Sequence, residues 1–218
     1  MKILGVSAGF HDAALTVLHN HKIQFAGHSE RSSKKKNDSS ISISLQQQAI
    51  KYGPFDKIVY YEKPHLRQLR KLRSGEDWGG AWTVRTELKQ TIPFIMEHTT
   101  AKISSVGHHL SHAAAGFQTS PFDDATVVVI DAIGESDTIS IYHAYYNGAC
   151  LAGEHAKANY KLLYKQTYPH SIGMFYNAVT QRCNLKPMDE EYITMGMAAY
   201  GDPEKAYTTL KDRTVKFT

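Results

Sequence analysis

A three-strand pattern that occurs twice constrains the fold of this 218-residue chain more than any other feature. Within each copy, apolar stretches of strand length are separated by short turns, such as Asn147-Gly148, so each copy is expected to be an antiparallel meander. The first copy is predicted at 2–8, 13–19 and 22–29, and the second at 124–131, 138–146 and 149–156. Because the same three-strand pattern begins both halves, we expect the chain to contain an internal duplication.

Helices and strands are expected to alternate between the two copies, and helices to follow the second. The predicted elements are a polar irregular stretch at 30–42, a helix at 43–52, a strand at 57–62, a helix at 64–73, a loop at 74–80, a helix at 83–98 that Pro93 can kink, a strand at 102–106, a helix from 108 to before Ser120-Pro121, and helices at 170–183 and 188–200. This order resembles the ribonuclease-H-like unit of actin, sugar kinases and Hsp70. We therefore expect an α/β fold of the actin-like ATPase type, with one complete subdomain over 1–122 and a truncated second copy over 123–218.

The composition excludes several classes of protein. A net charge of +4, with Lys34-Lys35-Lys36 as its one basic run, argues against a nucleic-acid-binding surface. Cys150 and Cys183 are too few for a disulfide framework. No apolar run approaches the roughly 20 residues that span a membrane, and the first residues lack the pattern of a signal peptide. A cytoplasmic protein without a membrane partner is expected.

The strongest local motif is GHHLSHAAAGF, residues 107–117. His108 and His112 are four residues apart, which places both side chains on one face of a helix. Two imidazoles in this arrangement can share one metal ion, whereas His109 points elsewhere. The alternative is a pair of polar histidines at the start of a helix, with no ligand.

Asp131 offers a third ligand, because it ends the apolar strand VVVID where the chain turns. Carboxylates at strand ends often line the cleft of α/β folds. Two histidines and one aspartate suit Fe(II), the expected metal, or Zn, and leave positions open for a substrate. The alternative is an aspartate that hydrogen-bonds its own backbone in the turn.

Two glycine-containing turns are candidates for nucleotide binding. Ser7 and Gly9 precede Asp12 in the first turn, and Gly134 lies beside Glu135 in the second. Small residues let backbone N–H groups approach phosphate oxygens closely. Each turn is weak evidence alone, because glycine in a turn requires no ligand.

Two further side chains are candidates for catalysis. His11 is a candidate acid or base, because histidine is the usual residue for this role at neutral pH. Lys36, with Glu30-Arg31, can hold a phosphate or carbamoyl group. The alternative for Lys36 is a solvated lysine in a polar loop.

Several segments together resemble one family, the O-carbamoyltransferases of antibiotic and nodulation-factor biosynthesis. The matching segments keep their order over nearly the whole chain and are ILGVSAGFHDAALTV, SERSSKKKND, GHHLSHAAAGFQTSPFDDATVVVIDAIGE, YPHSIGMFYNAVTQ and EEYITMGMAAYGDP. The resemblance implies an enzyme that uses carbamoyl phosphate and ATP to form carbamoyl-adenylate. It then passes the carbamoyl group to a hydroxyl of a small molecule.

The resemblance also implies roles for individual residues. His108, His112 and Asp131 fall on the metal ligands, and a further aspartate ligand is expected beyond residue 218. His11 and Lys36 fall on positions near the adenylate. The family's C-terminal adenylate-forming domain is expected to be absent from this chain, so a separate chain would supply it.

Two other functions remain open. A relative that transfers threonylcarbamoyl to tRNA would usually carry an H-x-E-x-H motif, whereas Leu110 and Ser111 occupy this region here. A non-catalytic module that binds a nucleotide or a partner protein is the second alternative.

Overall fold

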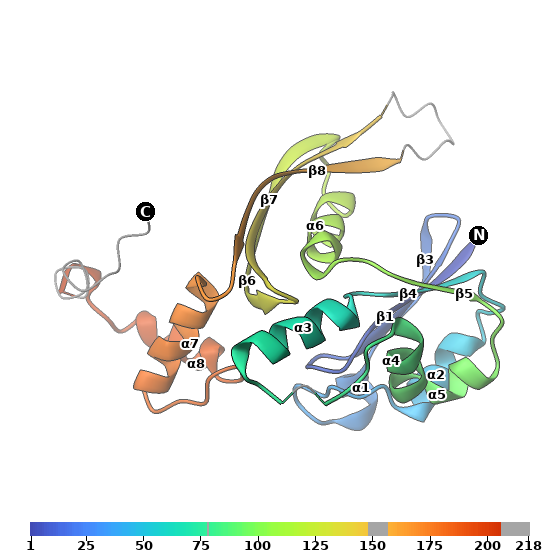
Figure 1. Ribbon diagram of the computed structural model, residues 1–218, viewed down its shortest axis with the longest axis horizontal. Helices are drawn as coiled ribbons and strands as arrows, with labels where there is room; N and C mark the ends of the chain where they lie inside the picture. The colour runs from blue at the N-terminus through green and yellow to red at the C-terminus, as the bar shows by residue number, and fades with distance from the viewer. Residues whose placement is uncertain (78, 148–156, 206–218) are drawn as a thin grey trace. The chain divides into compact units, whose positions relative to one another are not determined.

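The computed structural model of the chain describes residues 1–77, 79–147 and 157–205 (Figure 1). Two compact units, Met1–Ser171 and Ile172–Thr218, are described separately below. The elements of the first unit are β1 (Lys2–Ser7), β2 (Ala14–His19), β3 (Lys22–His28), α1 (Ser29–Ser33), α2 (Ile43–Ile50), β4 (Lys57–Tyr60), α3 (Pro64–Ser74), α4 (Val84–Thr91), α5 (Pro93–Glu97), β5 (Lys102–Ser105), α6 (His108–Gln118), β6 (Asp124–Gly134), β7 (Asp137–Tyr146) and β8 (Ala158–Thr167). The second unit contains α7 (Ile172–Arg182) and α8 (Glu191–Ala198).

The first sheet has five strands in the order β3-β2-β1-β4-β5. β1, β2 and β3 form the predicted antiparallel meander, whereas β4 and β5 continue the sheet in parallel with β1. The parallel strands β1, β4 and β5 therefore end at the same edge, at Ser7, Tyr60 and Ser105. Loops that leave this edge carry most of the side chains discussed below.

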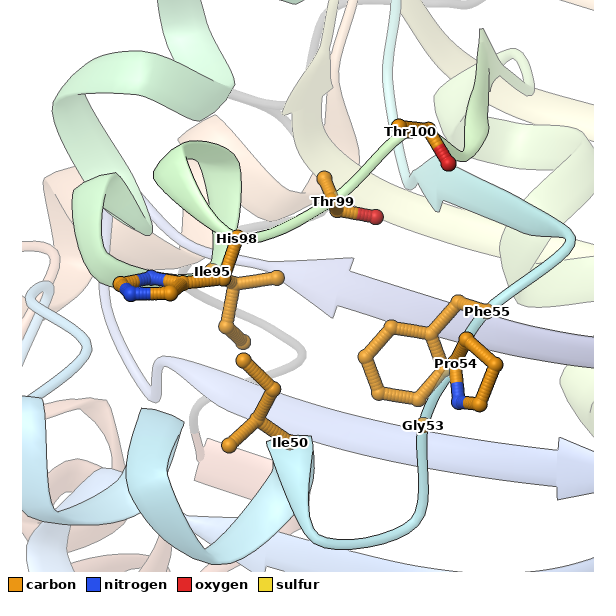
Figure 2. Close-up of a pocket in the computed structure, with 8 residues that line it drawn as sticks. All are labelled: Ile50, Gly53, Pro54, Phe55, Ile95, His98, Thr99 and Thr100. Carbon is orange, nitrogen blue, oxygen red and sulfur yellow. The ribbon is translucent and has the colours of Figure 1, made fainter.

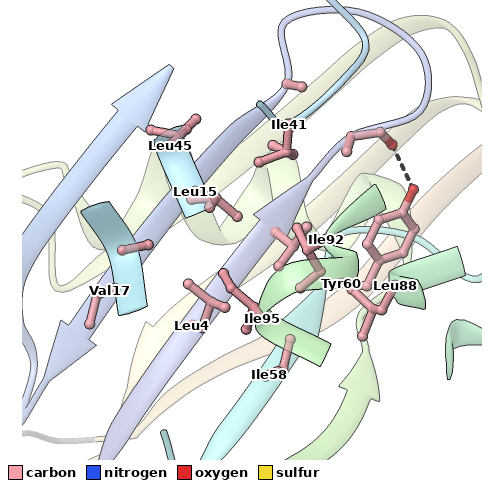
Figure 3. Packing of buried hydrophobic residues seen from close by; sticks show 14 of the residues in the cluster. Leu4, Leu15, Val17, Ile41, Leu45, Ile58, Tyr60, Leu88, Ile92 and Ile95 are labelled. Carbon is pink, nitrogen blue, oxygen red and sulfur yellow. Dashed lines mark hydrogen bonds between the residues drawn. The ribbon is translucent and has the colours of Figure 1, made fainter. Parts of the chain in front are cut away.

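Helices α2, α4 and α5 pack on one face of this sheet (Figure 3). Because side chains alternate along a strand, Leu4 and Val6 of β1 face these helices. The fully or nearly buried residues of this core are Leu4, Val6, Ala8, Ala13, Leu15, Val17, Ile41, Leu45, Ala49, Phe55, Ile58, Tyr60, Leu88, Ile92 and Ile95. The tyrosine is the polar exception, and its hydroxyl donates a hydrogen bond to the carbonyl of Ala8.

The second sheet has the order β6-β7-β8, and all its strands are antiparallel. Helix α6 covers one face, where Ala113 packs against Val129 and Tyr142. Val128 and Ile130 alternate with the buried Val129 and are 55% and 58% exposed, so they lie on the opposite face.

The repeated three-strand meander and the mixed α/β architecture are thus confirmed. The third strand of the second copy was placed wrongly: β8 runs over Ala158–Thr167, and the predicted range 149–156 lies outside the described residues. The sequence of β8, ANYKLLYKQT, has a continuous run of exposed residues from Lys161 to Lys165, so it lacks the alternation that identifies a half-buried strand.

The helix predicted at 83–98 is two helices, α4 and α5. Ile92 leaves the helical region of backbone space, with φ −133° and ψ 55°, directly before Pro93. Proline lacks an N–H group and disfavours helical geometry in the preceding residue. A short helix, α1, also interrupts the stretch predicted to be irregular.

In the second unit, both predicted helices are confirmed, with shorter bounds. Thr194 of α8 donates a hydrogen bond to Thr180 of α7, at 2.9 Å between their Oγ1 atoms. Cys183 is exposed and unpaired, whereas Cys150 lies outside the described residues. Within the described ranges, every helix is too short or too polar to cross a membrane.

Substitution of a core residue tests the packing of the first sheet. We expect Leu15→Ala to lower the free energy of unfolding by about 2–5 kcal/mol, because Leu15 is fully buried and alanine leaves a cavity. Leu72→Ala, at an exposed position of α3, is expected to change it by less than about 0.5 kcal/mol. Urea denaturation of the two variants measures the difference, and equal losses would contradict this packing.

Candidate metal centre

The candidate site is built on the edge where the parallel strands end. Glu62 follows β4, and His108 begins α6 shortly after β5. The backbone N–H of Val106 donates to the carbonyl of Tyr60, which ties the entry of α6 to the end of β4. Ligand sites of α/β sheets commonly lie at the carboxyl ends of their strands.

Helix α6 brings His108 and His112 together as their spacing predicts. Their Nε2 atoms are 3.0 Å apart. His109 points in a different direction, where it is buried and its Nδ1 lies 2.8 Å from the hydroxyl of Ser140 on β7. His109 therefore anchors the helix to the second sheet, whereas His108 and His112 lie on the side of Asp131.

Asp131 reaches this pair because β6 is irregular at that point. Between the pairs Ile130–Ile139 and Gly134–Asp137, three residues of β6 stand opposite a single residue of β7. Such bulges redirect side chains and are frequent beside active sites. The Asp131 Oδ2 atom lies 3.0 Å from His108 Nε2, and the Oδ1 atom accepts the N–H of Ala132 at 2.6 Å.

The donor set of His108, His112 and Asp131 fits a divalent metal. One ligand atom from each residue lies within 4.8 Å of the others. Two nitrogen ligands of one tetrahedral metal lie roughly 3.3 Å apart, given metal–nitrogen bonds of about 2.0–2.1 Å. The observed separations of 3.0 Å are close to this value, so a small adjustment of the side chains would admit an ion.

The pKa shifts of the three side chains show that negative and positive charges interact closely at this site. Burial opposes protonation of His108, but the carboxylates of Asp131 and Glu62 outweigh it and raise the pKa of His108 to about 9. Burial and the neighbouring His108 lower the pKa of His112. Burial would raise the pKa of Asp131, yet the contact with His108 holds it below its ordinary value. A positive charge is thus stabilised at the point where the three residues meet.

Gly134 and Glu135 both contact His108, the first residue of α6. A Cβ atom on Gly134 would lie 2.4 Å from Cδ2 of His108, so the ring of this histidine occupies the space that a side chain would take. The Glu135 carboxylate accepts the backbone N–H groups of His108 and Lys63 at 3.3 and 2.5 Å. Burial raises the pKa of Glu135, an effect that these two hydrogen bonds partly offset. The predicted role of both residues in nucleotide binding stays a prediction.

The first turn forms a second group of polar side chains. Ser7 ends β1, and Gly9 and Asp12 adopt the left-handed region of backbone space, with φ of 95° and 51°. The Asp12 carboxylate lies 2.7 Å from Nδ1 of His11 and 3.5 Å from Nε2 of His28.

Glu30 joins this group, since Asp12, His28 and Glu30 each place a ligand atom within 4.8 Å of the others. No sequence motif marks His28, which reaches this turn because Ala14 pairs with His28 in the β2–β3 hairpin. Arg31 in α1 and Lys36 in the following loop are exposed. The role predicted for Lys36 stays a prediction.

A small pocket of about 290 Å³ lies at the opposite edge of the first sheet (Figure 2). Its wall includes Gly53–Phe55 before β4 and His98–Thr100 before β5, so it adjoins the amino ends of these strands. Ile50 and Ile95 complete a largely apolar lining. It is therefore separate from the candidate metal centre.

Comparisons with known proteins show which family the chain resembles over nearly its whole length. A family model described as "Carbamoyltransferase N-terminus" matches residues 2–216. Uncharacterized protein sll1178 of Synechocystis sp. is 32% identical over 93% of the chain, and uncharacterized protein MJ1051 of Methanocaldococcus jannaschii is 26% identical over 95%. Nodulation protein NolNO of Sinorhizobium fredii is 25% identical over 88%. The chain spans about a third of the length of these relatives, namely 35%, 35% and 28%.

Two glycine substitutions test the packing of His108 on Gly134. Gly134→Ala is expected to lower the free energy of unfolding by about 1–3 kcal/mol, because the added Cβ overlaps the ring of His108. Gly116→Ala, on α6 with nothing within 4 Å of its Cβ position, is expected to be neutral or stabilising by up to about 1 kcal/mol. Thermal and urea unfolding would measure both, and equal behaviour of the two variants would refute the close approach.

Proposed function

Since this chain belongs to the carbamoyltransferase family, we propose that it forms the N-terminal part of an enzyme that carbamoylates a hydroxyl group of a small molecule. Carbamoyl phosphate and ATP are the proposed co-substrates, and carbamoyl-adenylate the activated intermediate. The observation that carries the proposal is the convergence of His108, His112 and Asp131 at the carboxyl edge of the first sheet. One relative is named a nodulation protein, which is consistent with a biosynthetic role.

We further propose an actin-like, ribonuclease-H-like fold. Its support is the repetition within the chain, since each sheet begins with three antiparallel strands in the same sequential order. In such a fold the turns after β1 and after β6 carry equivalent positions. Ser7, Gly9 and Asp12 in one turn, with Gly134 and Glu135 in the other, are the proposed nucleotide contacts.

His108, His112 and Asp131 are the residues proposed to hold a divalent metal, with Fe(II) as the first candidate and Zn as the second. When bound, the ion would supply Lewis acidity that polarises the carbonyl group of the carbamoyl donor. Glu135 and Gly134 contribute by fixing the start of α6, and thereby the orientation of His108.

His11 is proposed to receive the proton of the acceptor hydroxyl. If its Nδ1 donates to the Asp12 carboxylate, 2.7 Å away, the lone pair lies on Nε2, which can act as a base. In the transfer step, a bond forms between the acceptor oxygen and the carbamoyl carbon, and the bond from this carbon to the phosphate oxygen of AMP breaks. AMP leaves with the bonding electrons, and the hydroxyl proton passes to Nε2 of His11.

Lys36 is proposed to stabilise the negative charge of the leaving AMP phosphate. It lies in an exposed loop close in sequence to Glu30, which belongs to the same polar group as Asp12. The adenylate itself would be formed by a further domain or a separate chain, which is the proposed protein partner.

Metal content is the first prediction of this proposal. We expect the purified chain to bind one equivalent of Fe(II) or Zn, and His112→Ala or Asp131→Asn to lower the affinity at least about tenfold, because each removes one of three ligands. His143→Ala is the matched control, since its Nε2 also faces a carboxylate, that of Asp124 at 2.9 Å. Competition with a chelating dye measures the affinities. Equal binding by the three variants would refute the ligand set.

Carbamoyl transfer is the second prediction. We expect the chain, supplied with carbamoyl-adenylate and a panel of hydroxylated small molecules, to form a carbamoylated product detected by mass spectrometry, with release of AMP. His11→Ala should lower the rate about 10²–10⁴-fold, because it removes the proposed base. His143→Ala should leave it unchanged. Threonylcarbamoyl transfer to tRNA would instead identify the tRNA-modifying alternative, and nucleotide binding without transfer a binding module.

A further inference from the structure

We propose that Glu62 positions His108 as a metal ligand, and that Arg67 in turn holds Glu62. This inference rests on the proposed metal centre and extends it by a layer of residues that do not touch the ion. The three side chains come from the loop after β4 (Glu62), the first turn of α3 (Arg67) and the start of α6 (His108). Glu62 is only 4% exposed, so its carboxylate requires partners inside the protein.

The geometry of the His108 ring indicates what Glu62 does. The Nε2 atom faces Asp131 and His112, while Nδ1 on the other side of the ring lies 3.6 Å from Oε2 of Glu62. Nδ1 is buried, and no hydrogen bond to it is present among the described residues. Histidine ligands of metals usually donate their second ring N–H to a carboxylate, a carbonyl or water. A shift of a few tenths of an ångström would give His108 that hydrogen bond.

Arg67 explains why a buried glutamate can stand in this position. Its Nη1 donates to Oε1 of Glu62, which leaves Oε2 directed at His108. Its Nη2 donates to Oε2 of Glu87 at 2.6 Å. One guanidinium thus pairs with two buried carboxylates, and its planar shape fixes the orientation of both.

The same network reaches the first turn. Glu87 Oε1 lies 3.3 Å from the hydroxyl of Tyr60, which donates to the carbonyl of Ala8 at 2.6 Å. Ala8 stands three residues before His11 in the sequence. Glu87 pairs with Arg67 as Glu62 does, but its other contact is with Tyr60, beside the first turn. A substitution of Glu87 is therefore a control that distinguishes an effect on the metal centre from a general loss of stability.

The experiment compares Glu62→Gln with Glu87→Gln in the full chain, using Co²⁺ as the probe. Each substitution removes one charged partner of Arg67, but only Glu62 faces His108. We expect Glu62→Gln to weaken Co²⁺ binding roughly 10–100-fold, as the loss of outer partners of a ligand does, and to change the visible absorption of the bound ion. Glu87→Gln should keep the Co²⁺ affinity and spectrum within about threefold of the unmodified chain.

Stability is measured in parallel by circular dichroism and thermal unfolding, because both variants leave Arg67 with one partner. If Glu62→Gln does not fold, Glu62→Asp takes its place, since it keeps the charge but withdraws the carboxylate from His108; the same loss of affinity is expected. Unchanged affinity in the folded Glu62 variant, or equal losses in the Glu62 and Glu87 variants, would overturn the inference. If the unmodified chain binds no Co²⁺, the metal centre itself fails, which is a distinguishable result.

Discussion

The contact between Nε2 of His108 and Oδ2 of Asp131, at 3.0 Å, is the interaction on which the candidate site depends. It joins a helix that follows the first sheet to a strand of the second. Three features allow it: the irregular register of β6 at Asp131, the absence of a side chain at Gly134, and the hydrogen bond that Glu135 accepts from the backbone N–H of His108. Two of these features are contacts between the start of α6 and the end of β6 or the turn after it, so the site depends on how this helix packs against the second sheet.

Local patterns in the sequence predicted much of this arrangement. The spacing of His108 and His112 requires only the geometry of a helix. The apolar run before Asp131 was correctly predicted as a strand, but β6 continues to Gly134, so Asp131 lies at a bulge within the strand and not at the predicted turn. The alternation of helices and strands after the first meander is confirmed as well. These inferences succeeded because each depends on residues that are near one another in the sequence.

Contacts between distant segments could not be predicted in this way. Glu62, Arg67 and Glu87 have no motif, and only the folded chain shows that one guanidinium bridges two buried carboxylates. Gly134 was interpreted as a turn glycine, whereas the ring of His108 accounts for its lack of a side chain. The strand β8 was misplaced because its exposed residues show no period of two. In each case the deciding partner lies in another element.

Membership of the carbamoyltransferase family gives this geometry a chemical context, and the proposed metal centre is its central element. X-ray absorption spectroscopy of the zinc-loaded chain tests that centre most directly, because it reports the ligands around the ion. Coordination by His108, His112 and Asp131 predicts two imidazole nitrogens and carboxylate oxygen at about 2.0–2.2 Å, with further positions filled by water. A shell of oxygen atoms alone, without imidazole scattering, would contradict it.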